Sequence, residues 1–153
     1  MSQEQYLQRR AQLLSQIDGI CLIFANTSSV RNSDVEYIFR QDSDFFYLTG
    51  FQEPSAALML DSKAPKGEQV TLFLRERDPE MEIWDGFRLG VERAPEVLGV
   101  DRSAPIDTLE QALVDALPSR PNLYYSIGIP QRHQQDDLIV GAITKVNRRR
   151  KRN

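Results

Sequence analysis

The side chains that most often carry chemistry are scarce in this chain of 153 residues. The single histidine, His133, lies in the polar stretch QRHQQDD at the start of an expected helix. Histidine titrates near neutral pH and could act as a general base, but a surface or capping role is favoured in this polar setting. The single cysteine, Cys21, lies inside the apolar run ICLIFA, where burial disfavours the thiolate that a nucleophile needs.

The sequence motifs of the common cofactor and catalytic sites are missing. There is no glycine-rich phosphate loop, no two-histidine metal motif, no CxxC pair and no GxSxG elbow. Acidic residues are plentiful, but none has a spacing that demands a metal. The sequence therefore predicts no cofactor and no metal site in this chain.

Two other stretches could contact a ligand. The polar loop at 26–34, NTSSVRNSD, holds Arg31 and Asp34, a charged pair that could face a cleft. A solvated loop with local hydrogen bonds is the alternative. The stretch EIWDGFRLG, residues 82–90, holds the only tryptophan, Trp84. Tryptophan is enriched at binding hot spots, so Trp84 could either pack in the core or project towards a partner or substrate.

The elements that must position these stretches follow from apolar periodicity and chain breakers. Helices are expected over 3–16, 79–85, 94–98, 107–117 and 131–147, and strands over 20–25, 56–61, 69–75 and 122–127, with an extended piece at 35–39. The link SKAPKG is too short for a parallel crossover, so the two strands beside it are predicted to form an antiparallel hairpin. Asp107, with Glu110 three residues later, is expected to cap its helix. These elements indicate one α/β domain with a mixed sheet and helices on its faces.

The stretch RQDSDFFYLTG, from Arg40 to Gly50, predicts a short, deeply packed helical turn. Four hydrophobic side chains stand in a row from Phe45 to Leu48. Ser43 is expected to cap the start of this helix. Gly50 is expected to end it in the left-handed conformation.

Composition limits the partners. The net charge of −3 argues against a nucleic-acid-binding protein, although 148–152 is a basic run. One cysteine allows no intrachain disulfide, and no apolar run approaches the roughly 20 residues of a membrane span. The polar N-terminus has no apolar signal core. We therefore expect a cytoplasmic protein.

Several segments together resemble the N-terminal domain of the Xaa-Pro aminopeptidases, also called aminopeptidase P, of the creatinase–prolidase group. They are YLQRRAQLL (6–14), the long segment SDVEYIFRQDSDFFYLTGFQEPSAALML (33–60), EIWDGFRLG (82–90) and APEVLGVD (94–101). The resemblance implies a ribonuclease H-like α/β fold, with a mixed six-stranded sheet and helices on both faces.

Members of this family carry a second, C-terminal "pita-bread" domain. It binds two divalent metals, usually manganese, and supplies the catalytic residues. The resemblance implies that residues 1–147 are the non-catalytic N-terminal domain and that 148–153 begin the linker to the catalytic domain. On that reading the chain alone has no cofactor and no peptidase activity.

The resemblance also assigns roles. The family's N-terminal domain builds homo-oligomer contacts and shapes the mouth of an active site that accepts peptides with proline second. Asp34 matches an acidic residue near the position of the substrate's free amino group, and Trp84 matches a tryptophan that reaches towards a neighbouring subunit's active site. Arg88 matches a loop residue with no assigned role. The alternative is a stand-alone oligomerisation or interaction module without peptidase activity.

Overall fold

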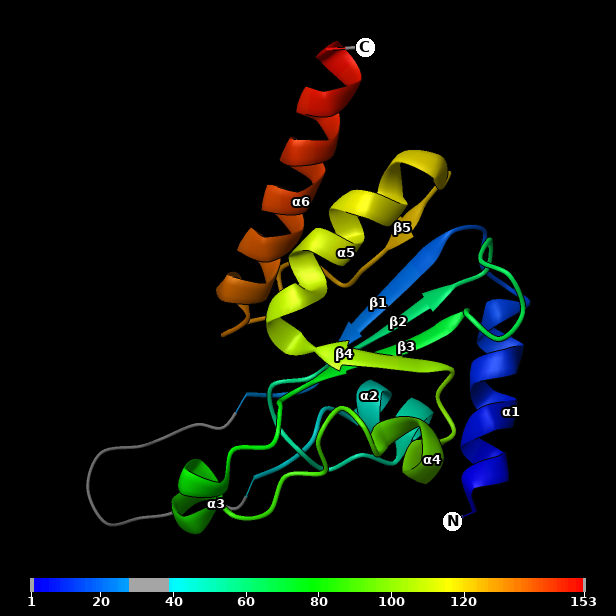
Figure 1. Cartoon of the computed structure of the whole chain (residues 1–153). Helices are drawn as coiled ribbons and strands as arrows, with labels where there is room; N and C mark the ends of the chain where they lie inside the picture. The colour runs from blue at the N-terminus through cyan, green and yellow to red at the C-terminus, as the bar shows by residue number, and fades with distance from the viewer. Residues whose placement is uncertain (1, 28–38, 153) are drawn as a thin grey trace.

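A computed structural model describes residues 2–27 and 39–152, which form a mixed sheet between two layers of helices (Figure 1). In chain order the elements are α1 (Gln3–Leu14), β1 (Ile20–Phe24), α2 (Ser43–Thr49), β2 (Ala57–Asp61), β3 (Val70–Leu74), α3 (Pro79–Asp85), α4 (Ala94–Leu98), β4 (Arg102–Pro105), the 3₁₀ turn η1 (Ile106–Thr108), α5 (Leu109–Ala116), the 3₁₀ turn η2 (Leu117–Ser119), β5 (Leu123–Tyr124) and α6 (His133–Arg152).

The strand order across the sheet is β4-β3-β2-β1-β5. β1 with β2, and β2 with β3, are antiparallel, whereas the edge strands β4 and β5 pair in parallel with β3 and β1. The predicted hairpin is confirmed, with its register running from Ala57 opposite Phe73 to Leu60 opposite Val70. The described part of the chain contains five strands, so the expected six-stranded sheet is not observed there.

Two differences concern the edges of the sheet. β4 was not expected, because RSAP carries no apolar alternation and becomes a strand only by pairing with β3. The strand expected over 122–127 shortens to Leu123–Tyr124. Of the extended piece expected at 35–39, all but Phe39 lies outside the described residues.

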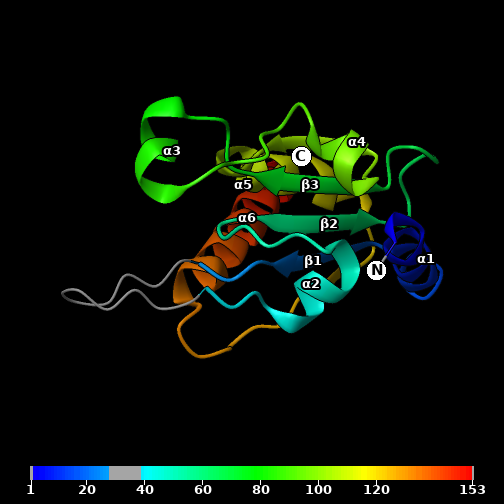
Figure 2. The same ribbon diagram turned by 90° about the horizontal axis from the view of Figure 1, so that it is seen from below.

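The alternating side chains of the strands build one core on each face of the sheet. α5 and α6 cover one face and bury Leu109, Leu113 and Ile139 against strand residues such as Leu22 and Met59. α1, α2 and α4 lie on the other face (Figures 1 and 2), where the core contains Phe45, Leu48, Ala94, Leu58 and Leu72. The expectation of helices on both faces is therefore confirmed.

The helical turn at α2 differs from the prediction in the residue that caps its start and in how deeply its side chains are buried. Asp42, not Ser43, caps the helix, since its carboxylate accepts from the Phe45 N–H at 2.8 Å. Gly50 ends it at φ 68°, as predicted. Phe45 and Leu48 are buried, but Tyr47 is 55% exposed. The helix therefore packs on one face only.

The last two helices also differ from their predicted bounds. Asp107 does not cap α5, because the 3₁₀ turn η1 leads directly into the helix and leaves no extended residue at its start. Glu110 pairs instead with Lys145 of α6. α6 continues to Arg152, so the expected domain boundary at 147 falls within a helix. None of the helices within 2–27 and 39–152 is long and apolar enough to cross a membrane.

One arginine of α1 is part of the interior. Arg10 is 1% exposed and donates to the carbonyl oxygens of Leu48 (2.8 Å), Leu98 (3.1 Å) and Gly99 (3.2 Å). These carbonyls lie at the C-terminal ends of α2 and α4, which attract a cation. Arg10 therefore joins three helices on one face of the sheet.

Candidate interaction site on helix α3

Trp84 lies on α3, and its side chain is 84% exposed. Both views show α3 standing away from the sheet and from the helices that cover it (Figures 1 and 2). α3 contributes no buried residue to either core. Of the two readings of Trp84, packing in the core of this chain is therefore wrong, and projection is the observed arrangement.

Trp84 has exposed apolar companions that sequence reasoning did not single out. Met81 is 44% exposed, Ile83 79% and Phe87 63%. We call these three side chains, together with Trp84, the α3 apolar surface. Large exposed apolar groups on one small projection are typical of a contact site. The four residues were visible in the sequence as a dense apolar group, but their spacing does not separate a buried face from an exposed one, so their exposure could not be predicted from it.

The ends of α3 are defined by local chemistry. Asp78 caps the helix, its carboxylate accepting from the Met81 N–H at 3.2 Å, and Pro79 occupies the first turn. Gly86 follows the helix at φ 93°, a conformation that glycine adopts without strain. The chain therefore reverses around α3 and returns to the sheet.

Two carboxylates join the segment that leads into α3 to the segment that leads out of it. Glu53 accepts from Arg75 at 3.2 Å and from the Leu89 N–H at 2.7 Å. Glu82, on α3 itself, accepts from the Arg77 guanidinium at 2.8 Å and from the Arg88 N–H at 2.9 Å. We call residues 75–90, bounded by these contacts, the α3 arm.

The charges within the α3 arm are largely satisfied by one another. Hydrogen bonding from the Arg88 N–H, and then from Arg77, lowers the pKa of Glu82, while partial burial opposes this. The Arg88 side chain is 13% exposed, donates to the Glu76 carbonyl at 3.2 Å and lies 3.8 Å from Asp85. Arg88 therefore holds the α3 arm together rather than offering its charge to solvent.

Asp34 and Arg31, the other candidate pair, lie outside the described residues. The chain on either side of 28–38 is described, and it is tightly hydrogen bonded. The Gln41 side-chain oxygen accepts from the Asn26 N–H at 2.9 Å. One Arg132 nitrogen lies 2.6 Å from both Asn26 Oδ1 and Asp42 Oδ1. These contacts bring the flanks at 26 and 40–42 together.

The remaining candidate groups do not form a reaction centre. His133 is exposed at the start of α6, in line with a surface role. Burial raises the pKa of Cys21 to about 11, so the thiol stays protonated at neutral pH. Across residues 2–27 and 39–152, no group of three or more His, Cys, Asp or Glu side chains could hold a metal ion.

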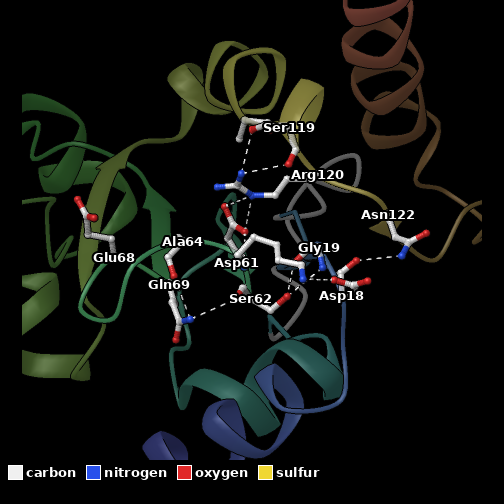
Figure 3. A network of polar contacts seen from close by, with 12 residues as sticks. Asp18, Gly19, Asp61, Ser62, Ala64, Glu68, Gln69, Ser119, Arg120 and Asn122 are labelled. Carbon is white, nitrogen blue, oxygen red and sulfur yellow. Dashed lines mark hydrogen bonds and ion pairs between the residues drawn. The ribbon is translucent and has the colours of Figure 1, made fainter.

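A polar network at one end of the sheet is structural (Figure 3). Asp61, at the end of β2, accepts from Arg120 Nε at 2.8 and 3.0 Å and from the Lys63 N–H at 3.0 Å. Gly19 donates its N–H to Ser62 Oγ, and Asn122 donates to the Asp18 carbonyl. The charged groups at its centre are paired with each other, so the network ties three chain segments together and offers no free charge to a ligand.

Comparisons with known proteins agree with the resemblance read from the sequence. Residues 6–125 match the family described as "Aminopeptidase P, N-terminal domain". The chain is 40% identical over 142 residues to the Xaa-Pro aminopeptidase of Haemophilus influenzae, covering 92% of this chain and 32% of that protein. It is 36% identical over 155 residues to the Xaa-Pro aminopeptidase of Escherichia coli, covering 100% of this chain and 35% of that protein.

Solved structures give the same picture. The zinc-substituted E. coli aminopeptidase P in complex with product superimposes with a TM-score of 0.90 at 36% identity, covering 100% of this chain and 35% of that one. The Pseudomonas aeruginosa aminopeptidase gives a TM-score of 0.89 at 34% identity, with 100% and 34% coverage. This chain therefore spans about a third of the length of the relatives that it matches.

Proposed function

This chain belongs to the aminopeptidase P N-terminal domain family, and from that premise we propose that it serves as the non-catalytic N-terminal domain of a Xaa-Pro aminopeptidase. The parent reaction would be removal of the first residue from peptides with proline second. Two divalent metals, manganese by resemblance, would be held by a catalytic C-terminal domain. The described residues of this chain offer no ligand set that fits them, so no step of the reaction is assigned to groups described here. A cytoplasmic location is part of the same proposal.

The observation that carries the proposal is the exposure of Trp84 on the α3 arm. A tryptophan that the chain's own core does not use has its full apolar face available to another surface. We propose that this surface is the active-site mouth of a neighbouring subunit in a homo-oligomer. There the indole would pack against the peptide and displace water.

Asp34 has a separate role in the proposal. A carboxylate pairs favourably with an ammonium group, so Asp34 would receive the free amino terminus of the peptide. The support for this role is its place in the matched segment 33–60, since the residue itself lies outside the described chain.

The alternative is a stand-alone oligomerisation module, which the same exposed apolar residues would also suit. The intact mass of the protein in its source cells separates the two. A mass well above 17.6 kDa is expected if a catalytic domain is attached. A mass of 17.6 kDa, with no manganese-dependent release of an amino acid from an Xaa-Pro peptide, would favour the stand-alone module.

A further inference from the structure

We propose that Glu82 and Glu53 are positioning residues that hold the α3 arm in one preformed shape and thereby fix where Trp84 is presented. The proposal deepens the function proposed above and rests on it for the identity of the partner surface. The shape of the α3 arm can be tested without that partner.

The first step of the argument is that α3 cannot be stabilised by packing or by length. It has seven residues, none of them buried. Isolated helices shorter than about 12–15 residues are marginal in water. Something other than a hydrophobic face must therefore keep α3 helical and the Trp84 side chain in place.

The second step is the arrangement of the two carboxylates at successive levels of the α3 arm. Nearest the sheet, Glu53 links Arg75 of the incoming segment to Leu89 of the outgoing one. One level further out, Glu82 links Arg77 to Arg88. Both carboxylate side chains are sheltered, with 17% exposure for Glu53 and 9% for Glu82. Charge-assisted hydrogen bonds of this kind are stronger than neutral ones.

Glu82 also reaches back to the start of its own helix. Its second oxygen accepts from the Asp78 N–H at 3.1 Å. One carboxylate therefore fixes the first residue before α3 and the second residue after Gly86. A helix held at both ends in this way loses little further freedom when it meets a partner, which favours binding.

The incoming and outgoing segments of the α3 arm also approach each other closely, which supports a preformed shape. Gly90 has φ +86°, and a Cβ at this position would lie 2.6 Å from Arg77 Cγ. The Arg77 guanidinium in turn lies 4.9 Å from the centre of the Phe87 ring. The incoming and outgoing segments are thus in contact at the level of Glu82, where its hydrogen bonds join them.

The test uses this chain and two readouts of the α3 arm. Trp84 is the only tryptophan, so its fluorescence anisotropy decay reports the motion of this one side chain. Amide hydrogen exchange by NMR reports the individual hydrogen bonds. For Glu82→Ala we expect exchange at Asp78 and Arg88 to rise about tenfold, and the amplitude of fast local motion of Trp84 to rise about twofold.

Three further variants make the result specific. Glu53→Ala should raise exchange at Leu89 rather than at Asp78. Glu82→Gln keeps one carbonyl acceptor and should restore part of the protection at Arg88. Glu80→Ala removes an exposed carboxylate from the same helix, so it is the matched control and should change neither readout. Circular dichroism should show a folded domain in every case, because α3 contributes no residue to the core and Glu53 is not a core residue.

Unchanged Trp84 motion in Glu82→Ala, or equal effects of Glu80→Ala and Glu82→Ala, would overturn the proposal. Failure of the proposed function looks different, since it would leave these two readouts as expected while Trp84→Ala has no effect on peptide hydrolysis in the oligomeric enzyme. The two proposals can therefore fail separately.

Discussion

Arg120 and Asp61 lie 59 positions apart in the chain, yet Arg120 Nε is 2.8 and 3.0 Å from the two carboxylate oxygens of Asp61. The side chains are 18% and 7% exposed, so water competes little for either group. The hydrogen bond with Asp61 raises the pKa of Arg120. The pair joins the turn before β5 to the end of β2, and so fastens the edge of the sheet to its centre.

Removing one member of this pair should destabilise the fold. Arg120→Ala leaves the Asp61 carboxylate sheltered without its partner, and we expect the free energy of unfolding to fall by about 2–3 kcal/mol. Lys63→Ala is the control, because the Lys63–Asp18 pair, although 2.6 Å apart, has side chains 49% and 56% exposed. Exposed pairs contribute about 0–1 kcal/mol. Urea unfolding of both variants checks the difference, and equal losses would contradict it.

Arg10 provides a second prediction about stability. Arg10→Met keeps a long side chain but removes the donors to the carbonyls of Leu48, Leu98 and Gly99. Buried acceptors without a donor are costly, so we expect a loss of about 2–4 kcal/mol. Gln8→Met, at an exposed position of the same helix, should change the free energy of unfolding by less than about 0.5 kcal/mol. Similar values for the two variants would show that Arg10 is not an interior residue.

Much of the fold could be predicted because its signals are local. The apolar run at 20–25 and the short link before 69 fix β1 and the hairpin, and Gly50 fixes the end of α2. β4 could not be predicted in this way, since Arg102–Pro105 becomes a strand only beside β3. The burial of Arg10 was not predicted, because an arginine in an amphipathic helix is expected at a polar position, although Arg10 falls on the same helical face as Tyr6 and Leu14.

The candidate site, unlike the fold, could be predicted from the sequence only in small part. The sequence pointed to Trp84 as the only tryptophan, but it left core and projection equally open. Glu53 and Glu82 gave no local sign of their role, because each acts on residues brought close by the folding of the α3 arm. Long-range hydrogen bonds of this kind have no fixed spacing in a sequence, so they are found only in a structure.

The charge of Glu82 leads to a prediction about pH. Its pKa in the folded protein lies below the ordinary value of 4.5, so the folded α3 arm prefers the ionised form. The stabilisation is therefore complete above about pH 4.5 and is lost as the pH falls through the lower folded value. The charged groups around Glu82 are Arg77, Asp78, Asp85 and Arg88.

We expect the amplitude of the local motion of the Trp84 side chain to increase as the pH falls below about 4.5. Glu82→Gln removes the titrating group, so the difference between the two pH profiles isolates Glu82 from Asp78, Asp85 and the nearby Glu53. Fluorescence anisotropy at several pH values, with circular dichroism to follow the whole fold, makes the comparison. Identical profiles for the two proteins would contradict the assignment.

Trp84→Ala separates a contact residue from a core residue. Because Trp84 is 84% exposed, its truncation should change the free energy of unfolding by less than about 0.5 kcal/mol. Phe45→Ala, at a fully buried aromatic of α2, should cost about 3–5 kcal/mol in the same assay.

In an oligomeric enzyme that contains this domain, Trp84→Ala should lower kcat/KM for an Xaa-Pro peptide about tenfold, as expected for a hot-spot aromatic. A large loss of stability would place Trp84 in a core after all, whereas unchanged stability and unchanged kcat/KM would leave its exposure without a role in catalysis. Only unchanged stability together with reduced kcat/KM fits a side chain that one subunit presents to another.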